Sequence, residues 1–425
     1  MKKTDMTVLV VGGGGREHAI VKKLSESPRV KKLYCAPGNA GIADIAECLP
    51  IKATDIDSMI SAAKDVSADL VFVAPDDPLA LGMVDRMEEA GIRAFGPCAR
   101  AAMLEGSKVF SKGLMKKYGI PTAGYEVFDS PETALEYITA KNEYPVVVKA
   151  DGLALGKGAV IAENEAAAKA ALETIMLEKA FGSSGDRVVI EEFLRGPECT
   201  VLSFTDGETV VPMVSSQDHK RALDGDLGLN TGGMGAFSPS RFYTPEIAKI
   251  SEETVFKPTI DALRAEGIIF KGVIYFQLML TESGPKVIEY NARFGDPETQ
   301  AVLPLLKTDL VDIIDACIDG GLDDIGLEWS DKASCCVVMA SGGYPEKYEK
   351  GFEISGLSEA NALSDTYVYH AGTALQDGNI VTAGGRVLGV TALGENLGQA
   401  IEKAYIGVLK ISFAGAHFRT DIGRK

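Results

Sequence analysis

The sequence predicts a multidomain protein of mixed α/β and α+β class, with a doubly wound parallel sheet at the N-terminus and a small α+β cap at the C-terminus. Its 425 residues are enough for about three domains. Strand and helix signals alternate over the first hundred residues, whereas short strands recur after about residue 325. We expect domains at residues 1–104, 105–325 and 326–425, with a lid subdomain at about 122–194 inside the second.

The composition is ordinary for a soluble globular enzyme, with 46% hydrophobic and 24% charged residues. No uninterrupted apolar run reaches the roughly 18 residues of a membrane span, so no membrane partner is expected. The net charge of -17 disfavours nucleic acid, because phosphate backbones bind basic surfaces, but local basic groups can still bind a small anionic substrate. Seven cysteines without a C-x-x-C pair disfavour a disulfide framework or a zinc site, and we expect a cytoplasmic location.

The N-terminal region begins with an apolar strand at residues 7–11 that runs into four glycines and a helix starting near Arg16. Further strands are expected at 32–36, 69–74 and 92–95, and helices at 57–64 and 79–90. A glycine loop at a helix N-terminus leaves backbone N–H groups unpaired, which suits an anion. We therefore expect a sugar phosphate at Gly13, Gly14 and Gly15.

A dinucleotide is the alternative ligand for this loop, but its fingerprint is incomplete. Glu17 or His18, depending on register, stands where the third glycine of G-x-G-x-x-G belongs. The second strand also lacks the terminal acid that would hold an NAD ribose, since it ends in Ala36 and a Pro-Gly-Asn turn. That turn, with the loops at 75–78 and 96–97, follows a strand carboxyl end, where open α/β sheets bind ligands, so Asn39 is a candidate ligand-binding residue.

In the central region, a strand at residues 145–149 is followed by a glycine-rich loop and a second strand at 159–162. The loop is not a P-loop, because Lys157 is followed by Gly158 rather than by Ser or Thr, and a strand rather than a helix comes next. Strand, glycine loop and strand predict a hairpin lid. Such a lid can place backbone N–H groups and Lys149 over a triphosphate.

Further along the chain, a strand at residues 286–288 leads into Glu289 and Asn291. Because one residue separates them, their side chains lie on the same face of the strand. Magnesium prefers hard oxygen ligands, so this pair suits a nucleotide-bound Mg²⁺. Arg293 follows on the same face and is a candidate to bind a phosphate or carboxylate through two parallel hydrogen bonds. An isolated Glu-x-Asn pair would more often lie at the end of a strand with both side chains in solvent.

The string RFGDPETQ at residues 293–300 resembles the signature of the phosphoribosylamine–glycine ligase (glycinamide ribonucleotide synthetase) family of the ATP-grasp superfamily. The resemblance covers essentially the whole chain. It implies an ATP-grasp fold for the central domain and ligation of glycine to 5-phosphoribosylamine through glycyl phosphate, in purine biosynthesis. ATP and Mg²⁺ or Mn²⁺ are the implied cofactors, with the metal on Glu289 and Asn291 and with Arg293 and Asp296 as catalytic residues.

The same resemblance assigns the remaining binding residues. For the nucleotide these are Lys108, Lys149, Gly156, Lys157, Gly158, Glu191, Glu192, Leu194 and Glu198. For the other substrates they are Gly13, Gly14, Gly15 and Asn39 in the N-terminal loops and Asp218, His219, Lys220 and Arg221 in a mobile flap. Residues 215–235 could equally form a solvated loop, since dense charge lies beside a flexible glycine tract.

One residue departs from the wider superfamily. Many ATP-grasp enzymes carry a second acidic metal ligand on the preceding strand, where this sequence has Gln277. A glutamine can coordinate through its amide oxygen but cannot neutralise the ion. We therefore expect Glu289 to be the only protein anion that contacts the metal.

The C-terminal region carries short strands at residues 333–340, 367–370, 379–382 and 386–391 and a helix at 397–411. His370 and His417 are expected to be structural, since no third metal ligand lies nearby in sequence. We expect a monofunctional chain that is a monomer or a weak homodimer. Three other functions stay open: an ATP-grasp carboxylase activating bicarbonate, a nicotinamide oxidoreductase, and a nucleotide-sensing protein without turnover.

Overall fold

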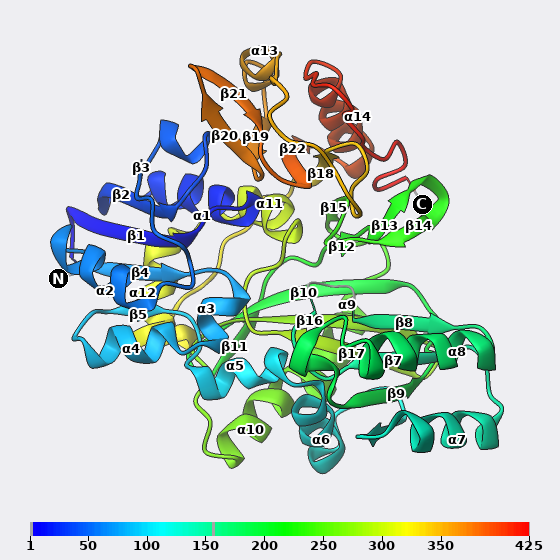
Figure 1. Ribbon diagram of the computed structural model, residues 1–425. Helices are drawn as coiled ribbons and strands as arrows, with labels where there is room; N and C mark the ends of the chain where they lie inside the picture. Colours follow the sequence, from blue (N-terminus) through cyan, green and yellow to red (C-terminus); the bar gives the residue numbers. More distant parts are fainter. Residues whose placement is uncertain (1–2, 155–157, 425) are drawn as a thin grey trace.

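The computed structural model describes residues 3–154 and 158–424, and Figure 1 shows its sheets and helices. The N-terminal sheet is wholly parallel, in the order β3-β2-β1-β4-β5. Its strands are β1 (Met6–Gly12), β2 (Val30–Pro37), β3 (Glu47–Cys48), β4 (Leu70–Val73) and β5 (Ala94–Phe95). Four consecutive residues of β1, from Val8 to Val11, are fully buried, because a parallel sheet is covered on both faces. The predicted doubly wound sheet is confirmed.

The helices around this sheet differ from the prediction at one point. They are α1 (Gly15–Ser25), α2 (Ile56–Asp65), α3 (Asp76–Ala80), α4 (Met83–Glu89) and α5 (Ala99–Gly106). The single helix predicted at 79–90 is wrong, since the chain forms α3 and α4 with Gly82 between them. Gly82 has φ of +80°, a left-handed conformation that interrupts a right-handed helix.

The central region is built from two antiparallel sheets. The larger has the order β11-β10-β16-β17, and the smaller, the lid sheet, has the order β6-β9-β7-β8. The larger contains β10 (Glu198–Thr205), β11 (Val210–Pro212), β16 (Gly272–Thr281) and β17 (Gly284–Asn291), and the lid sheet contains β6 (Tyr125–Phe128), β7 (Val146–Ala150), β8 (Ala159–Ala162) and β9 (Val188–Glu192). Strands β7 and β8 pair antiparallel, with Lys149 opposite Ala159, so the predicted hairpin is confirmed.

Helices flank both central sheets. They are α6 (Lys108–Tyr118), α7 (Pro131–Lys141), α8 (Glu165–Leu172), α9 (Pro245–Ser251) and α10 (Lys257–Ala265). Ser107 begins α6, because its side chain accepts a hydrogen bond from the backbone N–H of Phe110. Shorter helical turns occur at Ile42–Asp44, Glu173–Leu177, Gly182–Gly185, Asp224–Asp226, Glu252–Phe256, Leu303–Leu305 and Leu322–Asp324.

The C-terminal sheet has the order β12-β15-β18-β22-β19 and is covered by helices. Its elements are β12 (Gln217–Asp218), β15 (Gly235–Ser238), β18 (Ala333–Ala340), β19 (Thr366–His370) and β22 (Arg386–Gly394), with the hairpin β20 (Thr373–Gln376) and β21 (Asn379–Thr382) and the helices α13 (Leu357–Asn361) and α14 (Leu397–Val408). Two of its five strands, β12 and β15, come from the flap, about 100 residues before β18. The flap is therefore part of a sheet, and between β12 and β15 it forms the hairpin β13 (Arg221–Leu223) and β14 (Leu227–Asn230).

Two helices, one that begins within the signature string and one that follows it, join the modules. The short helix α11 (Glu298–Val302) contacts α1 on one side and β15 and β18 on the other (Figure 1). The next helix, α12 (Leu310–Asp319), packs against the N-terminal sheet, and Arg29 pairs with Asp312 at 2.6 Å and with Asp315 at 2.7 Å. Among the helices described, none is both long and apolar enough to cross a membrane.

Candidate active site

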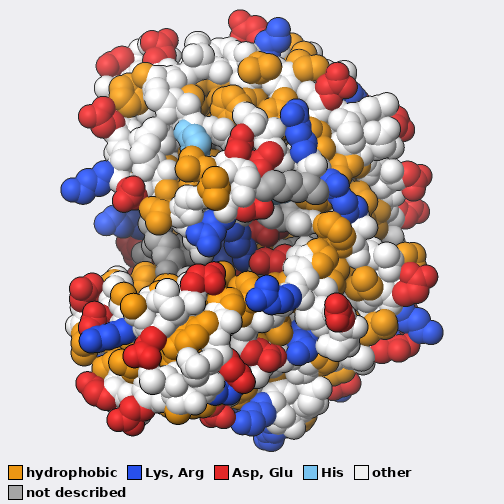
Figure 2. Space-filling view, turned by 90° about the vertical axis from the view of Figure 1, so that its right-hand side faces the viewer, with side chains coloured by type: hydrophobic (Ala, Val, Ile, Leu, Met, Phe, Trp, Pro, Cys, Tyr) orange, Lys and Arg blue, Asp and Glu red, His pale blue; other side chains and the backbone are white. Residues whose placement is uncertain are grey.

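A hollow opens on the face shown in Figure 2, and basic and acidic side chains gather on its walls. Two charged residues of the candidate site lie on the lid sheet. Val148 and Ile190 are buried under α7 and α8, so their neighbours Lys149 and Glu191 project from the opposite face of the sheet. The ammonium of Lys149 donates to the carbonyl of Ile288 in β17 at 3.3 Å. The open face of the lid sheet thus meets the larger central sheet.

A buried carboxylate on β9 connects two lysines. Lys149 and Lys112 lie 3.1 and 3.0 Å from the same oxygen of Glu191, Oε2. The other oxygen, Oε1, is buried and has no hydrogen-bond partner among the described residues. Burial lowers the pKa of Lys112 to about 8, against the attraction of Glu191. The sequence analysis missed Lys112, although its spacing of four residues from Lys108 places both on one helix face.

The predicted metal ligand Glu289 lies opposite Gln277 in the pairing of β17 with β16. Burial would raise the pKa of Glu289, but the attraction of Lys220, Lys149 and Lys108 outweighs it and lowers the pKa below its usual value. The Glu289 carboxylate is therefore held as an anion facing lysines from three separate segments.

The atoms around Glu289 fit a divalent cation. The Oε1 atom of Gln277 is buried without a hydrogen-bond partner in the described part of the chain, while its Nε2 donates to Glu198 at 2.6 Å. Oδ1 of Asn291 accepts a long hydrogen bond from Arg293, at 3.4 Å. One carboxylate and two amide oxygens are hard ligands of the type that Mg²⁺ takes together with water and phosphate. Within residues 3–154 and 158–424, no group of three or more His, Cys, Asp and Glu side chains is arranged to hold a metal.

Arg293 is tied to carboxylates that sequence reasoning did not assign. Its Nη2 donates to Oε1 of Glu105 at 2.8 Å and lies 3.6 Å from Oδ2 of Asp76. The second oxygen of Glu105 accepts from the backbone N–H of Ala292 at 2.7 Å. The Nε of Arg293 is buried without a partner among the described residues. Part of the guanidinium is thus fixed to the protein, and Nε is left for a ligand.

The first glycine loop and the Pro-Gly-Asn turn lie side by side at the carboxyl edge of the parallel sheet. The N–H of Gly38 donates to the carbonyl of Gly12 at 3.0 Å. Asn39, predicted as a substrate ligand, uses both amide hydrogens on the carbonyls of Gly13, at 2.9 Å, and His370, at 2.7 Å. Its Oδ1 accepts from two further backbone N–H groups. The side chain of Asn39 therefore holds the loop in place and has no hydrogen left for a ligand.

Asp296 lies beside this loop. A Cβ atom added to Gly14 would come 3.5 Å from Oδ2 of Asp296. The carboxylate accepts from Gln300 at 2.7 Å and pairs with Arg386 at 3.2 Å. Burial would raise the pKa of Asp296, but the attraction of Arg386, followed by that of Arg16, lowers it below its usual value. Arg386, which belongs to the C-terminal sheet, was not predicted from the sequence as a site residue.

The four flap residues divide into two pairs. The ammonium of Lys220 lies 3.9 Å from Glu198, and burial together with Glu298 raises the pKa of Asp218 to about 7, against the attraction of Lys220. By contrast, Arg221 donates to the carbonyl of Gly228, and the Nε2 of His219 accepts from the N–H of Gly423. The structure thus brings Asp218 and Lys220 to the carboxylates, whereas His219 and Arg221 bond the backbone of Gly423 and Gly228.

The remaining nucleotide candidates lie along the edge of the lid. Glu192 accepts from the N–H of Gly124 at 3.0 Å and pairs with Lys286 at 3.4 Å. Lys108 donates to the carbonyl of Gly152 at 3.3 Å, and the carbonyl of Gly158 accepts from Ala150 at 2.8 Å. Gly156 and Lys157 lie outside the described residues. For Leu194 the structure gives a half-buried position just after β9.

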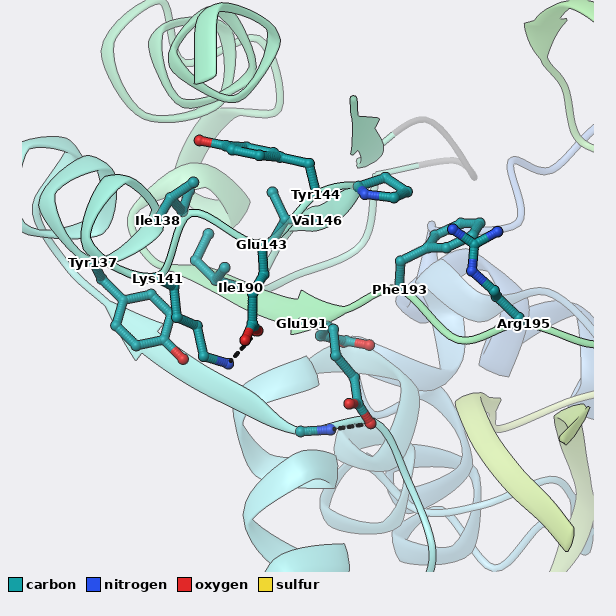
Figure 3. Close-up of a pocket in the computed structure, with 13 residues that line it drawn as sticks. Tyr137, Ile138, Lys141, Glu143, Tyr144, Val146, Ile190, Glu191, Phe193 and Arg195 are labelled. Atoms are coloured by element: carbon teal, nitrogen blue, oxygen red, sulfur yellow. Dashed lines mark hydrogen bonds and ion pairs between the residues drawn. The ribbon is translucent and has the colours of Figure 1, made fainter. Parts of the chain in front are cut away.

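A pocket of about 190 Å³ opens beside the end of β9 (Figure 3). Its walls come from α7, the start of β7 and the segment 190–195, and the Arg195 guanidinium stacks on Phe193 with 5.4 Å to the ring centre. Neither Lys149 nor Glu289 lines it. The pocket is therefore lined by two of the residues predicted to bind the nucleotide, Glu191 and Glu192, and Glu191 connects it to the charged cluster.

Comparison with known proteins identifies all three regions. Residues 6–105, 106–299 and 334–425 match the N domain, the ATP-grasp (A) domain and the C domain of phosphoribosylglycinamide synthetase. A phosphoribosylamine–glycine ligase of Caldanaerobacter subterraneus subsp. tengcongensis is 51% identical over 417 residues, which cover 98% of this chain and 99% of the relative.

Solved structures agree with this assignment. The phosphoribosylamine–glycine ligase of Thermotoga maritima matches with a TM-score of 0.86 and 33% identity, over 98% of this chain and 100% of that chain. A biotin carboxylase domain of the Hydrogenobacter thermophilus 2-oxoglutarate carboxylase matches with a TM-score of 0.74 at 16% identity, over 98% of this chain and 92% of that chain, and this likeness shows the fold alone. The resemblance carried by residues 293–300 is thus confirmed, and the chain belongs to the phosphoribosylglycinamide synthetase family, with an ATP-grasp central domain.

Proposed function

We propose that this protein joins glycine to 5-phosphoribosylamine with cleavage of ATP to ADP and phosphate, the activity named for its relatives, as a step of purine biosynthesis. The observation that carries the proposal is the cluster around Glu289. There, a carboxylate anion faces Lys108, Lys149 and Lys220 between the lid sheet and the larger central sheet. Such a cluster suits a metal-bound triphosphate with the γ-phosphoryl group among several ammonium groups.

The reaction consists of two displacements. A carboxylate oxygen of glycine forms a bond to the γ-phosphorus of ATP, and the bond from that phosphorus to the ADP oxygen breaks, which gives glycyl phosphate. The amine nitrogen of phosphoribosylamine then bonds to the acyl carbon, phosphate leaves with the carbon–oxygen electron pair, and the nitrogen loses one proton. The side chains contribute positioning and charge stabilisation, because phosphoryl transfer needs little covalent work from the protein.

A divalent cation, Mg²⁺ or Mn²⁺, would neutralise phosphate charge at this site. Glu289, Gln277 and Asn291 would hold it, since they supply one anionic oxygen and two neutral ones. Lys149 and Lys108 remain to stabilise the charge that develops on the transferred group. The Oε1 atom of Glu191, which is buried without a hydrogen-bond partner among the described residues, can accept a hydrogen bond from the adenine base.

Phosphoribosylamine is assigned to the N-terminal loops. The first turn of α1 follows the glycine loop and offers backbone N–H groups to a 5-phosphate. Asp296 lies beside Gly14, at the side of the loop where the amine would meet the acyl group. The cytoplasmic location and the monomeric or weakly dimeric state stay predictions.

The alternative, an ATP-grasp carboxylase that activates bicarbonate, shares the nucleotide site and is not favoured. The carboxylase structure is only 16% identical, whereas the ligase relatives match over the whole chain.

A coupled assay of ADP release tests the proposal. Release should require both glycine and phosphoribosylamine, and mass spectrometry should detect an amide of the two. Bicarbonate in place of glycine is the control for the carboxylase. Equal ADP release with bicarbonate, or release without an amide product, would rule out the proposed function.

A further inference from the structure

Arg386 opens β22 of the C-terminal sheet and reaches across to the signature string, 90 residues earlier in the chain. Its Nη1 donates to two backbone carbonyls, that of Gly232 at 2.6 Å and that of Asp296 at 2.7 Å. Its Nη2 pairs with Oδ2 of Asp296 at 3.2 Å. The guanidinium therefore fixes both the backbone and the carboxylate of one residue.

The partners of Arg386 are themselves closely packed. The N–H of Gly232 donates to the hydroxyl of Tyr344, at 3.1 Å, so the C-terminal module holds the glycine tract at two points. A Cβ on Gly233 would lie 2.4 Å from Cδ of Pro297, and Gly233 has φ of +113°. The glycine tract thus lies directly on the Asp296–Pro297 backbone, in a conformation that only glycine adopts readily.

Asp296 also lies beside the N-terminal domain. A Cβ atom added to Gly14 would lie 3.5 Å from Oδ2 of Asp296. Gln300, which donates to Oδ1 of Asp296, lies too close to Gly15 to leave room for a side chain there. The guanidinium of Arg16 donates to the carbonyl of Phe294 at 3.2 Å. Asp296 is therefore the point at which the glycine loop, the glycine tract and the C-terminal sheet meet.

An arginine is needed for these contacts. The two nitrogens of a rigid planar fork reach two carbonyls and one carboxylate oxygen together, whereas a lysine ammonium is a single point charge on a flexible stem. Removal of the guanidinium would leave the largely buried Asp296 carboxylate with less charge compensation and two backbone carbonyls with one donor fewer each. The carboxylate would then rotate or take up a proton.

We propose that Arg386 is a positioning residue for the second displacement: it aims the Asp296 carboxylate across the glycine loop, at the amine of the phosphorylated sugar substrate. Asp296 accepts a hydrogen bond from this amine. As the nitrogen bonds to the acyl carbon and phosphate departs, the carboxylate takes the proton that the nitrogen loses and passes it to solvent. The inference rests on the proposed function. It adds a residue of the C-terminal module to a reaction otherwise carried out by the other two regions.

The experiment compares steady-state kinetics of the full-length wild type with Arg386→Ala, Arg386→Lys, Asp296→Asn and the double variant Arg386→Ala/Asp296→Asn. We expect Arg386→Ala to lower kcat/KM for phosphoribosylamine by about 30-fold or more, because one aligned interaction is lost, while the KM for ATP stays within about twofold. Arg386→Lys should recover only a small part of the loss. The double variant should be no worse than Asp296→Asn alone, since Arg386 acts through Asp296.

Two controls separate positioning from folding. Methylguanidinium added to Arg386→Ala should restore part of the rate, which a misfolded protein would not allow. Arg100→Ala is the matched variant, because Arg100 is exposed and also donates to two backbone carbonyls, those of Glu266 and Gly267. It should leave all kinetic constants unchanged.

The outcomes are distinct. If Arg386→Ala raises the KM for ATP, glycine and phosphoribosylamine alike, or if the losses in the double variant add up, Arg386 does not act through Asp296 and the inference is overturned. If the wild type forms no amide, the proposed function itself fails, whatever the variants do.

Discussion

At the scale of single residues, the proposed metal site is asymmetric. Glu289 carries the only carboxylate of the expected ligand set, and its partner across the strands, Gln277, supplies a neutral oxygen that the described residues leave without a donor. The nearby lysines keep Glu289 ionised in spite of its burial. Catalysis should therefore depend far more on Glu289 than on Gln277.

We predict that Glu289→Gln lowers turnover by at least ~100-fold, because it removes the negative charge that balances the positive charges of the metal ion and the nearby lysines. Gln277→Ala should be milder. Gln277→Glu should bind Mg²⁺ more tightly without a higher kcat, since an added charge stabilises ground and transition states alike. Titrating Mg²⁺ against rate for the three variants checks this. Equal damage from Gln277→Ala and Glu289→Gln would contradict the asymmetry.

Some residue roles were readable from the sequence and others were not. The alternation of side chains along a strand predicted that Glu289 and Asn291 share a face, and the pairing of β16 with β17 brings Gln277 beside them. No pattern in the sequence indicates that Lys149 and Lys112 both pair with Glu191, because the three residues come from different elements. The full engagement of Asn39 is equally invisible, since one of its partners is the carbonyl of His370.

At the scale of elements, the glycine loop before α1 packs closely against Glu17 and leaves one edge open toward Asp296. Gly14 has φ of -91°, which any residue adopts, so its lack of a side chain reflects space rather than backbone strain. An added Cβ would meet Oε2 of Glu17 at 2.8 Å, and that oxygen already accepts from the N–H of Gly14. A side chain there would extend toward Asp296 and fill the edge of the loop.

We predict that Gly14→Leu raises the KM for phosphoribosylamine by about tenfold or more, because it blocks the proposed phosphate and amine positions, and leaves the KM for ATP nearly unchanged. Gly326→Leu is the control, since no atom lies within 4 Å of a Cβ at Gly326. Steady-state kinetics with each substrate varied in turn measures both constants. If ATP affinity fell as strongly in Gly14→Leu, the loop would belong to the nucleotide site or simply to the fold.

At the scale of the whole molecule, two histidines join the N-terminal domain to the C-terminal sheet. Nδ1 of His18 accepts from the backbone N–H of His370 at 2.8 Å, which requires a neutral acceptor on His18. Burial lowers the pKa of His18 to about 3, with a further contribution from His370, and lowers the pKa of His370 to about 4. His370, which was expected from the sequence to be structural, also bonds Thr373 at 3.1 Å.

These pKa values determine how stability changes with acid. Both histidines have lower values in the folded protein than the ordinary 6.5, so the unfolded chain binds more protons below that pH. Their contribution is complete above pH 6.5 and is lost as the pH falls toward the folded values. Each fully coupled histidine accounts for up to about 1.4 kcal/mol per pH unit of that loss.

We predict that His18→Asn, which keeps an acceptor near the His370 N–H but cannot titrate, loses less stability than the wild type between pH 6.5 and 5. Urea unfolding at a series of pH values measures the free energy of unfolding for both proteins. Between pH 7.5 and 8.5 the two curves should run parallel, which serves as the internal control. Equal slopes below pH 6.5 would show that His18 does not couple folding to acid.

Features that rest on local periodicity could be predicted from the amino-acid sequence alone. The buried run of β1, the hairpin of β7 and β8, the order of the modules and the family signature at residues 293–300 all follow from patterns within a few residues. The prediction failed at Gly82, where one glycine divides a predicted helix, because a helical hydrophobic pattern continues across such a break.

Only the tertiary structure decided which distant segments meet. The flap strands β12 and β15 join the C-terminal sheet, α12 packs on the N-terminal sheet, and Arg386 reaches Asp296. Each of these contacts links residues that are far apart in the chain. Strand periodicity shows which face of a strand is buried, but not which strand lies beside it or which charge lies opposite. These choices depend on the summed burial and hydrogen bonding of the whole molecule, and so the residues that complete this site became visible only in the fold.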